Sequence, residues 1–206
     1  MLKIYAGLAV VALAGLLGGT AFVAWQQRAN DPFADCRTSA VAGGGGAIGG
    51  PFTLVDEDGK TVTDKDVLAK PALVYFGYSF CPDVCPLDGA RNAESVDLLK
   101  AKGVDVTAVF ISIDPERDTP AVLKDFTANM HPQMIGLTGT QEQVQAASRA
   151  YKTYYKKQDT GDQYYMMDHS TFTYLMLPGI GFADFFTRDD TAEQIATRAA
   201  CFIEKS

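Results

Sequence analysis

Ala-Leu-Val-Tyr-Phe-Gly-Tyr at residues 72–78 runs directly into Ser-Phe-Cys-Pro-Asp-Val-Cys-Pro at residues 79–86. The first stretch is a short apolar run of the kind that forms strands buried on both faces of a sheet. From about residue 86 to residue 102 apolar residues recur at helical spacing, and Gly103 stands where a helix C-cap favours glycine. We therefore expect a central strand, a loop with two cysteines and then a helix.

The chain around this unit alternates between strands and helices. Upstream, residues 52–55 and 60–63 flank Asp58-Gly59, a pair that favours a tight hairpin turn. Downstream, the periodicity predicts, in chain order, a strand over 104–113, a helix over 119–130, a strand near 134–137, a helix over 141–151 capped by Thr140, strands over 171–177 and 181–187, and a helix over 191–203. This order predicts an α/β sandwich with a central mixed sheet.

Composition limits the class of protein. The 206 residues are 47% hydrophobic, which suits one domain with a real core and an appendage. The formal net charge is −7, and an acidic surface repels phosphate backbones, so nucleic-acid binding is not expected. The 4 cysteines are too few to build the fold from disulfides, and the 2 histidines restrict any histidine-based site.

Residues 4–25 carry no charge and are mostly Ala, Leu, Val and Gly. Because about 20 apolar residues cross the hydrocarbon core as a helix, this segment predicts a transmembrane anchor. A cleavable signal peptide has small residues at its far end, but this segment has the large residues Phe22, Val23 and Trp25 there. We therefore expect the anchor to be retained.

The charges around this segment favour one orientation. Lys3 precedes the segment, which places residues 1–3 in the cytoplasm and exports the C-terminal domain, although Arg28 opposes this rule. No Arg- and Ser-rich transit sequence precedes the anchor, so we expect a bacterial inner membrane with the domain in the periplasm. Residues 26–50 include the glycine-rich run 42–50, whose composition predicts a flexible tether to a folded domain over 51–206.

Cys81 and Cys85 stand at the expected junction of strand and helix. Two cysteines four apart can place their sulfurs on one face, close enough to share a ligand or to form a disulfide. The helix N-terminus stabilises negative charge, so we expect a lowered pKa for one or both thiols. The C-x-x-x-C spacing is wider than the C-x-x-C of many disulfide oxidoreductases, and it favours an ion held between the sulfurs over a structural bridge.

His169 lies just before the strand expected from residue 171, so we place it on a loop at a strand end, where functional groups are commonly presented. Two thiolates and one imidazole suit copper, because soft sulfur favours Cu(I) and imidazole helps to retain Cu(II). Zinc would usually need a fourth protein ligand. We expect Asp168 to orient the imidazole, the alternative being an ordinary loop carboxylate.

Three separate motifs resemble those of the Sco/SenC proteins. They are residues 75–86, residues 111–120 with the sequence Ile-Ser-Ile-Asp-Pro-Glu-Arg-Asp-Thr-Pro, and Asp-His-Ser at residues 168–170. The resemblance covers about residues 51–205 and implies a membrane-anchored, thioredoxin-like copper protein that serves assembly of the binuclear copper site in cytochrome c oxidase. Carried over to this sequence, it implies Cys81, Cys85 and His169 as the copper ligands.

The remaining candidate residues have simpler interpretations. The charged run 114–118 is expected to start a loop at Asp114 and to cap the next helix through Asp118 or Thr119. Met166-Met167 could pass copper through soft thioethers, but neighbouring methionines usually fill gaps in packing. Cys36 in the tether and Cys201 in the last helix are left over, and in an oxidising compartment such cysteines tend to pair. We predict a Cys36–Cys201 disulfide, the alternative being two free thiols.

The leading hypothesis is a copper metallochaperone, not an enzyme in the sense of turnover. It would bind one copper ion and pass it by ligand exchange to the copper-site subunit of cytochrome c oxidase, with other periplasmic copper chaperones as further candidate partners. The alternative is a thiol–disulfide oxidoreductase that uses Cys81 and Cys85 as a redox pair to keep cysteines of an oxidase subunit or a copper protein reduced. A peroxiredoxin-like peroxidase is a third hypothesis.

Overall fold

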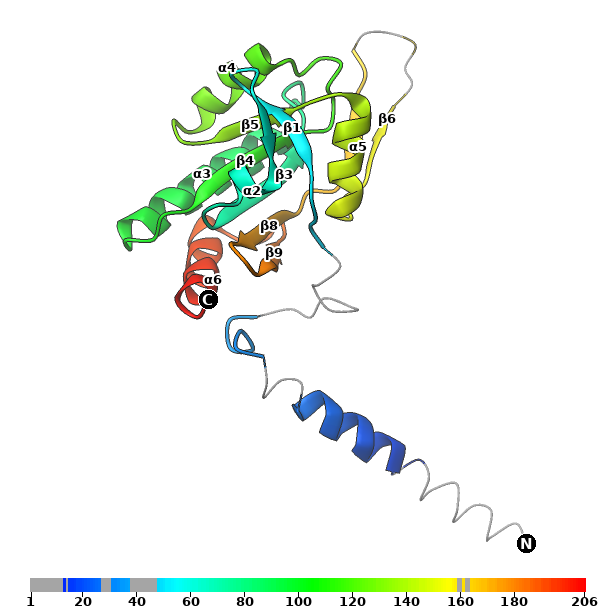
Figure 1. Ribbon diagram of the computed structural model, residues 1–206, viewed down its shortest axis with the longest axis vertical. Coiled ribbons are helices and arrows are strands. Elements are labelled where there is room, and N and C mark those ends of the chain that lie inside the picture. Colours follow the sequence, from blue (N-terminus) through cyan, green and yellow to red (C-terminus); the bar gives the residue numbers. More distant parts are fainter. Residues whose placement is uncertain (1–12, 14, 27–30, 38–47, 159–160, 162–163) are drawn as a thin grey trace, which may run out of the picture. The chain divides into compact units, whose positions relative to one another are not determined.

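The computed structural model describes residues 13, 15–26, 31–37, 48–158, 161 and 164–206. The chain forms two compact units, one over residues 1–38 and one over residues 39–204. Figure 1 shows both units. The second unit holds the sheet and both cysteines of the C-x-x-x-C motif.

In the first unit, residues 15–26 are helical, and their large side chains, such as Leu16 and Trp25, are exposed. Within the described part of the chain, no helix combines the length and the apolar character that crossing a membrane requires. Of the predicted anchor, residues 4–12 and 14 lie outside the described residues. In the predicted tether, the Arg37 guanidinium pairs with Asp31 at 3.1 Å, and residues 27–30 and 38–47 lie outside the described residues.

A mixed sheet of seven strands forms the centre of the second unit, in the order β2-β1-β5-β4-β3-β8-β9 (Figure 1). The strands are β1 (Thr53–Asp56), β2 (Thr61–Thr63), β3 (Ala72–Gly77), β4 (Thr107–Ser112), β5 (Ile135–Thr138), β8 (Thr173–Leu177) and β9 (Gly181–Phe186). The three central strands β5, β4 and β3 are parallel, and the strands on either side pair antiparallel. The expected α/β arrangement around a central mixed sheet is confirmed.

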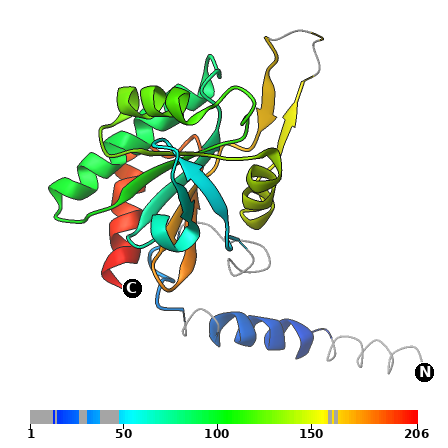
Figure 2. The same cartoon turned by 45° about the horizontal axis from the view of Figure 1, so that its top comes forward.

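The helices cover both faces of this sheet. They are α2 (Asp64–Val67), α3 (Val84–Ala101), α4 (Pro120–Met130), α5 (Gln141–Ala150) and α6 (Ala192–Glu204). Helices α3 and α4 are the connections between parallel strands, and α6 packs against α3. Figures 1 and 2 show α5 on the opposite side of the sheet from these three helices.

Strand β3 is the centre of the core, because all six of its residues are buried. Its side chains alternate between the two faces. Tyr75 contacts Phe110, whose ring lies 4.9 Å from that of Phe126 on α4. Phe76 points to the other face, where its ring lies 5.2 Å from that of Tyr151 at the end of α5. The strand is thus held on both sides, which fixes the position of the loop that follows it.

The helix ends follow the expected signals. Helix α3 begins at Val84, two residues before the expected start, and Gly103 beyond its end has φ +79°, the left-handed conformation that a C-cap glycine adopts. Thr119 caps α4 and Thr140 caps α5, each accepting a backbone N–H with its side chain. The hairpin of β1 and β2 is also confirmed, with Gly59 at φ +80°.

One element was not expected from the sequence. Strands β6 (Tyr155–Lys157) and β7 (Met167–His169) form a separate two-stranded antiparallel sheet, called the β6–β7 hairpin below. The expectation that His169 lies on a loop is therefore wrong, because His169 is the last residue of β7 and pairs with Tyr155. Strands of three residues are too short to show a clear alternation, which is why the pattern was not visible.

Candidate metal centre

The two cysteines lie at the carboxyl end of β3. After Gly77, residues 78–83 form the loop that leads into α3, and Cys85 falls in the first turn of that helix. Asp118 holds this loop in place, because Ser79 donates its backbone N–H and its hydroxyl to the buried Asp118 carboxylate. Asp118 therefore anchors the cysteine loop, while Thr119 alone caps α4.

Cys81, Cys85 and His169 converge although 84 residues separate Cys85 from His169. Their ligand atoms all lie within 4.8 Å of one another. His169 Nε2 is 3.4 Å from Cys85 Sγ, and Cys81 Sγ accepts the backbone N–H of Cys85 at 3.4 Å. The chain places them together because β7 leads into β8, which pairs directly with β3.

The two thiols have opposite electrostatic surroundings. The pKa of Cys81 is lowered to about 4, first because the Cys85 thiol donates to its sulfur, and further because backbone N–H groups at the start of α3 point at it. The pKa of Cys85 is raised, because its proton is held by Cys81 and because the side chain is buried. One thiolate and one thiol therefore share the site at neutral pH, which agrees with the expected lowering for one of them.

The imidazole of His169 is oriented by the backbone. Its Nδ1 lies 2.8 Å from the carbonyl oxygen of Ser170, which can only accept, so Nδ1 carries the proton and Nε2 presents its lone pair to the sulfurs. The rings of Tyr75 and Tyr78 stand edge-on to the imidazole at centroid distances of 6.3 Å and 5.8 Å.

Asp168 has a different place from the one expected. Its carboxylate accepts a hydrogen bond from the Gln158 side chain at 2.7 Å and is exposed. Neighbouring residues on a strand point to opposite faces, so Asp168 faces away when His169 faces the sulfurs. The role of orienting the imidazole thus falls to the Ser170 carbonyl, which no side-chain pattern in the sequence could indicate.

The wall behind the sulfurs is formed by β3 and α3. A Cβ on Gly77 would meet Cys85 Sγ at 3.0 Å and the Tyr75 ring at 2.8 Å, so glycine is required for the backbone to pass this close. The Tyr75 hydroxyl donates to the buried carboxylate of Asp88 at 3.0 Å. Tyr75 and Gly77 stand within the motif that carries the resemblance, but the sequence alone assigned them no role.

The donor set fits a soft metal ion. Two sulfurs and an imidazole nitrogen are the ligands that Cu(I) prefers. The other histidine, His131, lies at the C-cap of α4 and its Nε2 is 3.2 Å from Asp97. Met167 is buried and its backbone N–H donates to the Tyr78 hydroxyl, and Met166 is partly exposed with its sulfur 3.9 Å from the same hydroxyl.

The chain is similar in sequence to known proteins over most of its length. The chain is 53% identical over 196 residues to Protein SenC of Rhodobacter capsulatus, covering 95% of this chain and 88% of that protein. It is 39% identical to the mitochondrial Protein SCO1 homolog of Homo sapiens, covering 74% of this chain and 52% of the human protein.

Solved structures show the same fold. The crystal structure of Arabidopsis thaliana ScoI with copper bound matches with a TM-score of 0.75 and 40% identity, covering 78% of this chain and 100% of that one. Yeast Sco1 with copper bound matches with a TM-score of 0.72 and 35% identity, covering 78% and 90%. The expected thioredoxin-like α/β fold is confirmed by these matches. The profile of the SCO1/SenC family matches residues 41–204, and the chain therefore belongs to that family.

Proposed function

We propose that this chain binds one copper ion through Cys81, Cys85 and His169 and delivers it for assembly of the binuclear copper site of cytochrome c oxidase. The observation that carries the proposal is the convergence of two sulfurs and one imidazole nitrogen within 4.8 Å. Membership of the SCO1/SenC family and the relatives solved with copper bound support copper as the ion.

The three ligands differ in what they must give up to bind. Cys81 is already a thiolate at neutral pH, so it can capture the ion first. Cys85 must lose its proton, so binding releases a proton and tightens as the pH rises through the thiol range. His169 presents Nε2 toward the sulfurs, because its Nδ1 is held by the Ser170 carbonyl.

Delivery follows from the depth of the ligands. Cys85 is 0% exposed, Cys81 is 6% exposed and His169 is partly exposed. An incoming ligand from the partner therefore reaches the ion from the side of His169 and Cys81, and Cys85 is the last ligand to leave. A site of three ligands leaves a coordination position at which such an exchange can begin.

We further propose that residues 4–25 anchor the chain in a bacterial inner membrane with the copper-binding domain in the periplasm. The absence of charge in this segment and the exposed apolar side chains on residues 15–26 support this. An anchored domain on a tether searches a small volume near a membrane partner, which raises its effective concentration. Cell fractionation checks the anchor: the full chain should stay with the membranes after an alkaline wash.

The test is Cu(I) affinity of the full chain, measured by competition with a chelator. Wild type should bind one ion, Cys81→Ser and Cys85→Ser should abolish competitive binding, and His169→Ala should weaken it by about tenfold or more. His131→Ala is the matched control, because His131 lies elsewhere in the fold and should bind like wild type. Wild-type affinity in His169→Ala would refute the three-ligand site.

The second candidate is a thiol–disulfide oxidoreductase. The Cys81 thiolate beside the Cys85 thiol favours it, since this is the arrangement of an attacking and a resolving cysteine. His169→Ala separates the two functions when disulfide reduction is measured beside copper affinity. If His169→Ala loses thiol–disulfide exchange while its copper affinity stays intact, the oxidoreductase becomes the leading candidate.

A further inference from the structure

The β6–β7 hairpin, which carries His169, has little support of its own. Its two strands pair only with each other and do not join the main sheet. An isolated two-stranded ribbon is marginally stable in water. The position of His169 over the sulfurs therefore depends on contacts between the hairpin and the rest of the domain.

Several of these contacts involve Arg117, in the loop between β4 and α4. The guanidinium donates through Nε to the Asp114 carboxylate and through Nη1 to the Tyr165 carbonyl oxygen at 3.0 Å. Its central carbon lies 3.7 Å from the centroid of the Tyr165 ring, close enough for a cation–π contact. Arg117 thus contacts both the backbone and the ring of Tyr165, the residue of the hairpin that lies shortly before β7.

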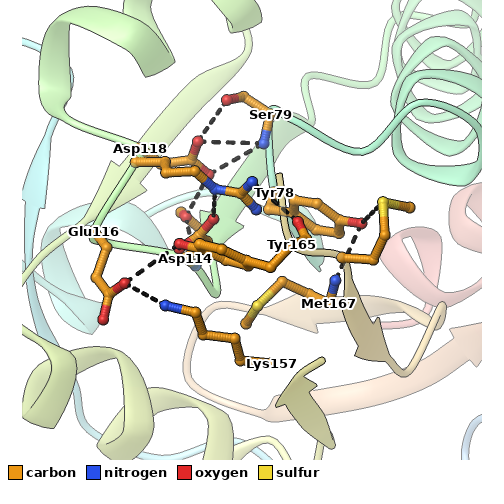
Figure 3. A network of polar contacts seen from close by, with 11 residues as sticks. Tyr78, Ser79, Asp114, Glu116, Asp118, Lys157, Tyr165 and Met167 are labelled. Atoms are coloured by element: carbon orange, nitrogen blue, oxygen red, sulfur yellow. Dashed lines mark hydrogen bonds and ion pairs between the residues drawn. The ribbon is translucent and has the colours of Figure 1, made fainter. Parts of the chain in front are cut away.

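Asp114 links Arg117 to the Tyr165 hydroxyl. Its side chain is only 3% exposed, and its second oxygen accepts the Tyr165 hydroxyl at 2.7 Å. Figure 3 shows Tyr165 between Asp114 and Glu116, with Lys157 of the same hairpin paired to Glu116 at 2.7 Å. That outer pair is largely exposed and contributes little. We call the set of Arg117, Asp114 and Tyr165 the Arg117 clamp.

The same guanidinium also touches the loop that carries Cys81. Its central carbon lies 4.9 Å from the ring centroid of Phe80 and 5.7 Å from that of Tyr78. Tyr78 in turn accepts the backbone N–H of Met167, two residues before His169, as Figure 3 shows. The clamp therefore joins the segment with the imidazole to the segment with the sulfurs, although it contains no metal ligand.

We propose that the Arg117 clamp positions His169 over the two sulfurs and so sets the contribution of the imidazole to copper binding. With the clamp closed, the ion has three ligands. When the clamp loosens, the hairpin carries the imidazole away while both sulfurs keep the ion, which gives the incoming ligand its place. This inference rests on the proposed function, and Arg117 acts in it as a positioning residue.

The test compares Arg117→Lys with a matched control, Arg198→Lys, in the full chain. Arg198 makes the same kinds of contact on α6: a 2.6 Å pair with the buried Asp184, a bond to the Phe185 carbonyl, and a ring contact with Phe186 at 4.6 Å. Lysine keeps the charge in both places but loses the forked hydrogen bonds and the planar stacking. Both variants should therefore lose stability, and only Arg117→Lys should affect the site.

Three measurements distinguish positioning from simple stability. In the apo-protein, the rate of hydrogen exchange at the hairpin amides of residues 155–158 and 164–169 should rise in Arg117→Lys and not in Arg198→Lys. Cu(I) affinity should fall about tenfold, the scale seen when a group that orients a ligand is lost. The nitrogen hyperfine signal in the Cu(II) paramagnetic resonance spectrum should weaken.

A double-mutant cycle decides whether the effect passes through His169. In a His169→Ala background, Arg117→Lys should lower Cu(I) affinity no further, because the imidazole is already absent. Additive losses would overturn the proposal, as would wild-type affinity and nitrogen signal in Arg117→Lys. If Arg117→Lys does not fold, Tyr165→Phe removes only the hydroxyl that Asp114 accepts, and unchanged hairpin exchange in that variant would also overturn it. Hydrogen exchange of the apo-protein tests the clamp even if His169 proves not to bind copper.

Discussion

Cys81 and Cys85 have the same side chain, but their positions at the start of α3 give them different protonation states. Cys81 stands before the helix, where backbone N–H groups point at its sulfur, while Cys85 stands in the first turn with its sulfur against β3. The sequence predicted that a thiol near a helix N-terminus is acidic. Which thiol this would be depends on the path of the loop, which the sequence pattern does not contain.

This asymmetry makes a prediction about pH. The apo-protein should show the ultraviolet absorbance of one thiolate at neutral pH, and this absorbance should disappear only as the pH falls through about 4, the pKa of Cys81. Cys85→Ala removes the thiol that donates to Cys81, so the midpoint should move upward, whereas Cys85→Ser keeps a donor and should move it less. Acid titration followed by absorbance checks this. A midpoint in the usual thiol range in wild type would contradict it.

The residues that could be predicted are those that act through their own functional groups. Both sulfurs and the imidazole were candidates from the spacing and from the three motifs, and the structure brings them within 4.8 Å of one another. Ser170 was not, because it acts through a backbone carbonyl, and Asp118 and Arg117 were interpreted as a cap and a turn. Their contacts cross between segments that are distant in the chain, so local patterns do not show them.

At the scale of elements, the position of His169 depends on the phase of β7, that is, on which of its residues point to which face of the strand. Within this strand Met167 and His169 share one face, and Asp168 takes the other, beside Gln158. The long helices and the buried strands could be predicted, because each contains enough residues to show its period. The three-residue strands β6 and β7 could not, since three residues are too few to show a period.

Exchanging two neighbouring residues tests this phase. The double variant Asp168→His/His169→Asp keeps the composition but moves the imidazole to the face of β7 that turns away from the sulfurs. Its Cu(I) affinity should fall at least as far as that of His169→Ala, by about tenfold or more. Asp168→Ala is the control and should bind copper like wild type. A nitrogen signal of wild-type strength in the exchanged variant would show that strand alternation does not place the ring.

At the scale of the whole molecule, local pattern identified most strands and helices but not how they are arranged. The sequence did not show that the hairpin of β1 and β2 joins the sheet beside β5, or that β8 returns next to β3. These pairings join distant segments, and many orders of the same strands satisfy the same local pattern. The return of β8 has the largest functional consequence, because β7 immediately before it carries His169 to the sulfurs.

The predicted Cys36–Cys201 disulfide is the longest-range covalent link proposed for this chain. It would tie the tether to the last helix, and in an oxidising compartment two cysteines outside the metal centre are expected to pair. In the chain-entropy model a loop of this length stabilises the folded state by about 5 kcal/mol. The bond would therefore stabilise the folded domain without contributing any group to the candidate metal centre.

Peptide mapping of the unreduced full chain checks this pairing. A linked peptide containing Cys36 and Cys201 should be found in wild type and in Cys81→Ser, which serves as the control because it changes a cysteine of the metal centre instead. Cys201→Ser should lose the linked peptide and lower the Tm by about 10 °C or more, the shift expected for several kcal/mol in a domain of this size. Its Cu(I) affinity should stay at the wild-type value, since the two sulfurs and the imidazole all lie elsewhere. Alkylation of both Cys36 and Cys201 in the unreduced protein would show that the pair does not form.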